Sequence, residues 1–452
     1  MEQNQEKQLI LSENLWKVCI QLSLPAVIAM VLFGLNVVFD AFFVGRYVGN
    51  DALAGISIVY PLTQIPLGIG SLIGVGAGSY LSILIGEDNK EIQRRLVGAS
   101  NVCILLFSAI TMILGLVFMN PLLHTMGATG DILQYAKEYY IISLIGMPLS
   151  IGGIGYNMII RAEGKMKLAA IIMGIGLLVN VCANYVFMVI FSYGVAGAAW
   201  GTNLGMFIYI VLFFVYCGSK KASFETNEYR LYFDKPLIKE IISLGMPSFI
   251  MSIMTVIQGG IIMKVLNSYG TGADVAFYGV VFRLFNLFLT PIYGLMRALQ
   301  PVVGVNYGAK QYERTIQAYK IFSIVAFIFM LPLWGVSILM PQTVLGFMLP
   351  NTSFSIENIH YFQIFITVAP LLCVVLTAMT FYPAIKKPKP AMLVGMGRQV
   401  FLYIPLMILL PKIMGIGGIY IGSFGIDAFL TIIIVLMLRK DFKELRKMED
   451  MR

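Results

Sequence analysis

The sequence predicts an all-α integral membrane protein in which twelve transmembrane helices form two pseudo-symmetric six-helix bundles. Three observations predict this fold class: an apolar composition, an alternation of apolar spans with basic segments, and a repeat of the first half of the chain in the second. Of the 452 residues, 58% are hydrophobic and only 12% are charged, whereas soluble domains carry about 25% charged residues. We therefore expect the lipid bilayer to be the solvent of this chain.

Most of the 32 Lys and Arg residues lie in seven short polar segments that alternate with the apolar spans. These segments lie near the N-terminus and around residues 90–95, 161–167, 220–239, 310–320, 386–389 and 439–452. The intervening loops offer only Arg46 and Lys412. Because cytoplasmic loops are enriched in Lys and Arg, this pattern predicts that both termini are cytoplasmic. We expect a multi-pass protein of a bacterial-type inner (plasma) membrane.

Each crossing needs roughly 20 apolar residues, and the apolar runs accommodate twelve crossings. The predicted helices of the first half are 15–44, 53–84, 96–119, 136–160, 168–191 and 195–217. Those of the second half are 238–266, 276–305, 318–340, 361–383, 391–411 and 416–438. In the second helix Gly70, Gly74 and Gly78 recur every four residues. This spacing leaves one face without side chains and favours close helix packing.

The second half of the chain repeats the first. When Pro25 is aligned with Pro247, Lys165 falls on Lys387 within an ordered series of matched residues, which indicates duplication. Each half has an even number of spans, so both enter the membrane in the same sense, and a cavity is expected between them. The predicted units are an N-terminal lobe at 1–222, a C-terminal lobe at 223–452 and a cytoplasmic linker at 218–236.

Several classes of function are excluded by the same composition. The five Cys residues have neither disulfide nor zinc spacing, and His124 and His360 lie in separate loops, so neither a metal cofactor nor a histidine-based catalytic centre is expected. No predicted span has two acidic residues, which a Mg²⁺-dependent membrane enzyme would need. The net charge of +9 is explained by loops near anionic lipid, without nucleic acid as a partner. We expect a protein that is not an enzyme.

A group of polar side chains lies inside the predicted spans of the first lobe. Asp40 and Asn36 are one turn apart in the first helix, and Asn180 and Asn184 repeat that spacing in the fifth. At 1.5 Å per residue, Asp40, Asn184 and Thr202 reach the same outward layer. Together they could surround a small hard cation such as Na⁺, or Asp40 alone could carry a proton. Alternatively, the amides only join helices by hydrogen bonds.

Other polar residues fall in the spans of the second lobe. Arg398 and Asp427 have similar estimated depths on successive helices and form a candidate structural ion pair, because one buried charge needs another. Met251, Met254 and Gln258 share a face of the seventh helix and are candidates, with Arg283, for lining a substrate cavity. The sequence does not identify the partners of Arg283 and Arg297.

Several motifs resemble the multidrug and toxic compound extrusion (MATE) family over about residues 20–435. They are Asp40-Ala-Phe-Phe-Val-Gly45-Arg46, Arg161-Ala-Glu-Gly-Lys-Met-Lys167 and Gln300-Pro301-Val-Val-Gly304. The segment Gly397-Arg398-Gln399 and the embedded Asp427 are similar to the MepA-like branch, and the first-lobe polar group is similar to DinF-like members.

The resemblance implies the MATE fold, with two lobes that open alternately and exchange drug-like, cationic, amphipathic compounds for inward H⁺ or Na⁺, without a cofactor. In DinF-like members the cation site uses residues that match Asp40, Asn180, Asn184 and Thr202. The position of Asn184 is commonly aspartate there, so Asp40 is left as the sole acidic group here. We expect a monomer. The alternative is a lipid-linked oligosaccharide flippase, which has a similar architecture.

Overall fold

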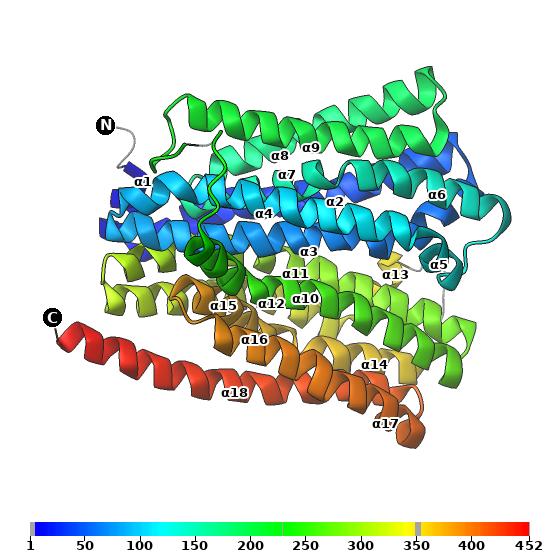
Figure 1. Ribbon diagram of the computed structural model, residues 1–452. Coiled ribbons are helices and arrows are strands. Elements are labelled where there is room, and N and C mark those ends of the chain that lie inside the picture. Colours follow the sequence, from blue (N-terminus) through cyan, green and yellow to red (C-terminus); the bar gives the residue numbers. More distant parts are fainter. Residues whose placement is uncertain (1–4, 228, 349–353, 452) are drawn as a thin grey trace.

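The computed structural model describes residues 5–227, 229–348 and 354–451, and all regular elements among them are helical. Two helical bundles lie against each other (Figure 1), the first formed by α1 to α9 and the second by α10 to α18. The first contains α1 (Gln5–Ser12), α2 (Leu15–Tyr47), α3 (Asn50–Glu87), α4 (Lys90–Val117), α5 (Met119–Thr125), α6 (Gly130–Ile145), α7 (Met147–Ala162), α8 (Met166–Asn184), the π-helix η2 (Tyr185–Ile190) and α9 (Gly194–Gly218). The second contains α10 (Lys235–Tyr269), α11 (Gly272–Gly308), α12 (Tyr312–Leu339), α13 (Pro341–Met348), α14 (Ile356–Thr367), α15 (Ala369–Ala384), α16 (Pro388–Met396), the π-helix η3 (Gly397–Tyr403), α17 (Ile404–Met414) and α18 (Gly417–Asp450).

The predicted fold class is confirmed. Within the described ranges, 11 helices are long and apolar enough to cross a membrane, and a bent pair raises the number of spans to 12. This pair, α6 and α7, is bent by 56°, where the sequence analysis expected one helix over 136–160. The break follows Gly146, and Pro148 occupies the first turn of α7. A proline there cannot donate the hydrogen bond that would continue α6.

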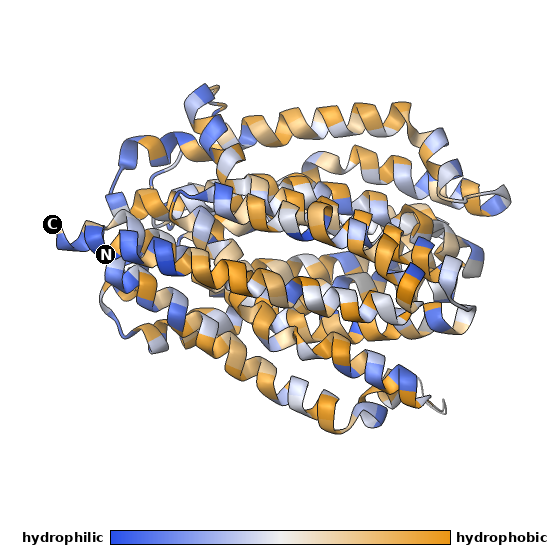
Figure 2. Ribbon diagram, turned by 90° about the horizontal axis from the view of Figure 1, so that it is seen from below, coloured by the Kyte–Doolittle hydropathy of each residue, from blue (hydrophilic) through white to orange (hydrophobic). Residues whose placement is uncertain are grey.

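Apolar residues occupy the middle of the bundles, whereas hydrophilic residues gather at their ends (Figure 2). Helix α1 and the end of α18 lie at the same end of the molecule (Figure 1). We call this end the basic face, because the predicted basic segments lie there, and we call the opposite end the far face. The arrangement matches a multi-pass protein whose apolar belt lies in the bilayer.

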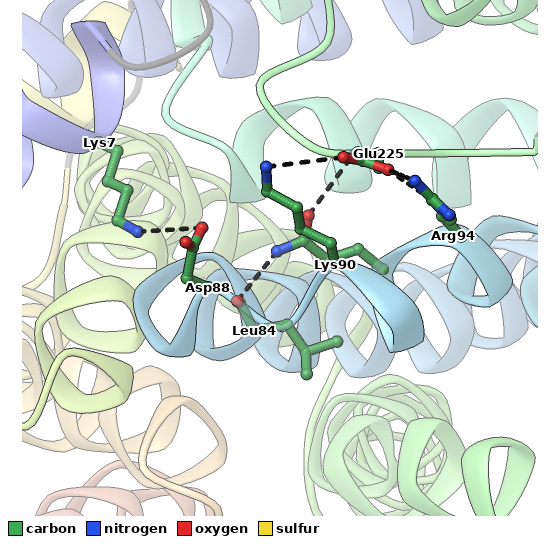
Figure 3. A network of polar contacts seen from close by, with 7 residues as sticks. Lys7, Leu84, Asp88, Lys90, Arg94 and Glu225 are labelled. Atoms are coloured by element: carbon green, nitrogen blue, oxygen red, sulfur yellow. Dashed lines mark hydrogen bonds and ion pairs between the residues drawn. The ribbon is translucent and has the colours of Figure 1, made fainter.

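The linker between the bundles is held to the first bundle by polar contacts at the basic face (Figure 3). Glu225 of the linker accepts a hydrogen bond from Nε of Arg94 at 2.5 Å and lies 3.7 Å from Nζ of Lys90. Nearby, Nζ of Lys7 in α1 lies 3.6 Å from Oδ1 of Asp88, which follows α3. The part of the segment around Glu225 is therefore docked on the first bundle, and residue 228 lies outside the described residues.

Glycines bring the two bundles into backbone contact in the half of the molecule near the basic face. A Cβ added at Gly245 of α10 would lie 1.7 Å from the carbonyl oxygen of Leu72 in α3. A Cβ added at Gly76 would lie 1.9 Å from the carbonyl oxygen of Ile241. Only glycine permits such an approach, so this half of the interface is closed. The predicted glycine face of α3 also packs closely against α7, since a Cβ at Gly74 would lie 2.9 Å from Met158.

A buried carboxyl group, Glu163, lies in the turn between α7 and α8. Its side chain accepts hydrogen bonds from Oη of Tyr216 and from the backbone N–H of Ser223 in the linker, both at 2.6 Å. Glu163 is only 2% exposed. Burial raises the pKa of Glu163 to about 7, although the bond from Tyr216 opposes that increase. Its ionised form is therefore disfavoured in the folded protein.

We expect Glu163→Gln to flatten the pH dependence of thermal stability. The folded protein holds the Glu163 proton up to about pH 7, whereas the unfolded chain releases it near its ordinary pKa of 4.5. Stability should therefore fall by up to about 3 kcal/mol as pH rises through this window. Unfolding midpoints at pH 5 and 7.5 would measure the effect, and Glu91→Gln, whose side chain is 78% exposed, is the control. If the unfolding midpoint changed equally between pH 5 and 7.5 in the wild type and in Glu163→Gln, the prediction would be contradicted.

Candidate functional site

The structure brings together the polar residues that the sequence analysis selected in the first bundle. Asp40 of α2 accepts a hydrogen bond at Oδ1 from Nδ2 of Asn184, at 2.7 Å, and one at Oδ2 from Oγ1 of Thr202, at 3.3 Å. Asn184 is the last residue of α8, and Thr202 lies in the third turn of α9. Three helices therefore converge on one carboxylate.

Asn180 and Asn36 complete this cluster. The amide of Asn180 is best satisfied with its nitrogen 3.2 Å from Oδ1 of Asp40 and 3.1 Å from Oδ1 of Asn36, while its oxygen accepts from the N–H of Thr202 at 3.1 Å. Asn180 is 2% exposed and Asn184 is fully buried. Oδ1 of Asn184 has no hydrogen-bond partner, so it is a free acceptor beside the carboxylate.

Two glycines of α9 that the sequence analysis missed allow α8 to approach closely enough to form this cluster. A Cβ at Gly201 would lie 2.1 Å from Oδ1 of Asn184, and one at Gly205 would lie 3.2 Å from Cβ of Asn180. The signal was present in the sequence, because Gly197, Gly201 and Gly205 recur every four residues. The π-helix η2 begins directly after Asn184, and π-helical turns occur frequently at functional sites.

We expect Gly201→Ala to disrupt the Asp40 cluster. The added methyl group would displace the amide of Asn184, which would lower stability by about 1–3 kcal/mol and remove a donor from Asp40. Gly425→Ala in α18 is a matched control, because a Cβ there meets nothing within 4 Å. Thermal unfolding and transport assays of both variants would test this. If Gly201→Ala had the unfolding midpoint and transport rate of the wild type, neither stability nor transport would depend on the observed position of Asn184.

The Asp40 cluster lies at the wall of a cavity of about 920 Å³ between the bundles. Asp40, Asn36 and Thr202 line it from the first bundle, and Arg283 and Asn286 line it from α11. These residues lie in the half of the molecule toward the far face, and the interface is closed on the other side. Among the described residues that line this cavity, Asp40 is the only acidic one, so it is the anionic group that they offer a cation.

Arg398 and Asp427 also lie together. Nε and Nη2 of Arg398 donate to Oδ1 and Oδ2 of Asp427 at 2.5 and 3.0 Å, in a bidentate geometry. The pair lies at a cavity of about 120 Å³ inside the second bundle, which Met251 and Gln258 also line.

Met254 lines neither of these two cavities, and Thr255 occupies the expected place. Met251, Thr255 and Gln258 follow the i, i+4, i+7 spacing of one helix face, and Met254 is turned about 100° from Thr255. Arg283, which was predicted in the same group, lines the larger cavity instead. No cluster of three or more His, Cys, Asp or Glu side chains that could hold a metal ion occurs among the described residues.

Two helical bundles that span the membrane, with a cavity between them that is lined by both apolar and polar side chains and is closed toward one face, define a membrane transporter. The chain belongs to the MatE family, whose model matches residues 25–186 and 247–409. The two matches fall in the two bundles, in agreement with the predicted repeat.

The chain is similar to the multidrug export protein MepA of Staphylococcus haemolyticus (strain JCSC1435), with 27% identity over 298 residues. That match covers 65% of this chain and 65% of the relative. The fold is similar to the crystal structure of MATE in the bent conformation, with a TM-score of 0.91, 22% identity and 98% of each chain covered. It is also similar to the outward-facing conformation of a multidrug resistance MATE family transporter of the MOP superfamily, with a TM-score of 0.88, 22% identity, and 98% of this chain and 99% of the other covered.

Proposed function

We propose that this chain is a secondary active multidrug exporter that moves drug-like, cationic, amphipathic compounds out of the cell in exchange for inward H⁺ or Na⁺. Membership of the MatE family and the similarity to MepA support export. The proposal of ion coupling depends on the position of Asp40. Its carboxylate faces the cavity and is contacted by two side-chain amides and one hydroxyl group.

Either ion would change the hydrogen bonds of this cluster. In the observed arrangement the amides of Asn184 and Asn180 donate to Asp40, which favours the ionised carboxylate. A proton on Asp40 would compete with these donors, whereas Na⁺ would require oxygens, such as the free Oδ1 of Asn184. Because the ion rearranges contacts among α2, α8 and α9, its affinity would differ between conformations of the first bundle, as coupling requires.

We further propose that the basic face is cytoplasmic, in the inner membrane, so that the 920 Å³ cavity belongs to an outward-open state. Residues 1–222 and 223–452 would then move as two lobes around the linker at 218–236, and the contacts of Gly76 and Gly245 would separate in the inward-open state. One chain supplies both cavities and the complete Asp40 cluster, so we propose that it functions as a monomer.

Efflux from proteoliposomes under separately imposed pH and sodium gradients tests this function. We expect a fluorescent organic cation to be transported under one of the two gradients and to remain in place without a gradient. A transport rate that is the same with and without each gradient would contradict cation coupling. Binding of a lipid-linked pyrophosphate in place of organic cations would favour the flippase alternative.

A further inference from the structure

The guanidinium groups of Arg161 in α7 and Arg297 in α11 are buried at least in part and have no acidic partner among the described residues. Arg161, which is 5% exposed, donates from Nε to Oδ1 of Asn157 at 2.8 Å, and its Nη2 contacts Sδ of Met173 at 2.8 Å. Arg297 in α11 is partly buried, and its Nη1 contacts Sδ of Met158 at 3.7 Å. A neutral amide and thioether sulfurs do not compensate a positive charge.

The two guanidinium groups lie near each other, which increases the need for an anion. Met158, the contact of Arg297, is one turn before Arg161 in α7, and the positive charge of Arg297 acts on Arg161. Glu163, the acidic residue nearest in sequence, is bound instead to Tyr216 and Ser223. Arginine does not release its proton in proteins, and an isolated charge is costly to bury.

Helix termini compensate these charges only in part. Arg161 lies in the last turn of α7, where the negative end of the helix dipole stabilises a cation. Arg297 lies in the interior of α11, where no such end is available. Arg297 is therefore the residue that most requires a negative partner.

A cavity of about 130 Å³ offers room for that partner beside Arg297. Its lining includes the hydroxyl-bearing residues Ser71 of α3, Ser248 of α10 and Thr380 of α15, and the Gln300 side chain of α11. Hydroxyl groups can donate to an anion, and none of the described residues that line the cavity is acidic. The two positive charges disfavour a cationic ligand here.

We propose that this cavity is an anion site, in which Arg297 contacts a singly charged anionic group and Arg161 adds a second positive charge nearby. The ligand is either a small inorganic anion such as chloride or the carboxylate of a zwitterionic compound. Because the lining residues come from both bundles, the anion would stabilise the closed half of the interface. The site is separate from the Asp40 cavity and does not depend on cation coupling.

The test uses the purified full chain in neutral lipid nanodiscs, without substrate and at constant ionic strength. When gluconate is replaced by chloride, we expect the thermal unfolding midpoint of the wild-type protein to rise by about 2–4 °C and to saturate. Arg297→Gln should abolish this response. Arg439→Gln, at an exposed position of α18, is the control and should retain it.

Two further measurements keep the proposal falsifiable. If Arg297→Gln does not fold, Arg297→Lys should keep the response but require about tenfold more chloride, because lysine lacks the guanidinium fork. Acetate distinguishes the two possible ligands. If acetate raised the unfolding midpoint and chloride did not, the site would be supported and its ligand would be a carboxylate. No wild-type response to either anion, or an equal response in the Arg297 variants, would overturn the proposal.

Discussion

Asp40→Asn should reduce ion-driven efflux to background while leaving the protein folded. Asparagine has nearly the same shape, and it can still accept one hydrogen bond from Asn184 or Thr202. It can neither take up a proton at physiological pH nor neutralise Na⁺. Because no other acidic residue lines the cavity within the described ranges, no carboxylate there can replace Asp40. We expect efflux driven by the effective gradient to fall on the order of 100-fold.

Asp51→Asn is the matched control, because Asp51 is an exposed residue in the first turn of α3. It should transport normally. Binding of a fluorescent organic cation, measured without a gradient, separates loss of coupling from loss of the cavity, and it should persist in Asp40→Asn. Gradient-driven efflux at the wild-type rate in Asp40→Asn would exclude Asp40 as the coupling site.

The spans and the first-bundle cluster were accessible from the sequence because both follow regular helix geometry. An apolar run of sufficient length must cross the bilayer, and a constant rise per residue places Asp40, Asn184 and Thr202 at one depth. The structure places these three side chains within hydrogen-bonding distance. Helical spacing places both Met254 (i+3) and Thr255 (i+4) on the side of Met251, so spacing alone could not show that Thr255 lines the second-bundle cavity and Met254 does not.

Features set by tertiary contacts were beyond the sequence analysis. Helix α1 was not predicted, since its residues are mostly polar and its one buried residue is Ile10. The carbonyl of Ile10 accepts hydrogen bonds from Arg314 and Asn306 of the second bundle, contacts that no local pattern reveals. The π-helices η2 and η3 were also not predicted, because π-helical turns are rare and the apolar pattern of a membrane span does not distinguish them from an α-helix.

Arg398→Ala should destabilise the second bundle by about 3–5 kcal/mol, because it leaves the carboxylate of Asp427 buried without a partner. Asp427 has a side-chain exposure of only 4%, against 24% for Arg398, so the stranded charge has little access to water. Removing both groups, in Arg398→Ala with Asp427→Ala, should recover part of the loss. Thermal unfolding of the two single variants and the double variant would give the coupling energy of the pair.

The exposed pair formed by Arg446 and Glu313 supplies the matched control. Its N–O distance is 3.0 Å, but its side chains are 53% and 40% exposed, so the same substitutions there should change stability by about 0–1 kcal/mol. If the stability losses of Arg398→Ala and Asp427→Ala added up in the double variant, the two charges would be stabilised by separate partners. A recovery confined to the buried pair would show instead that Arg398 and Asp427 stabilise the second bundle mainly by compensating each other's charge.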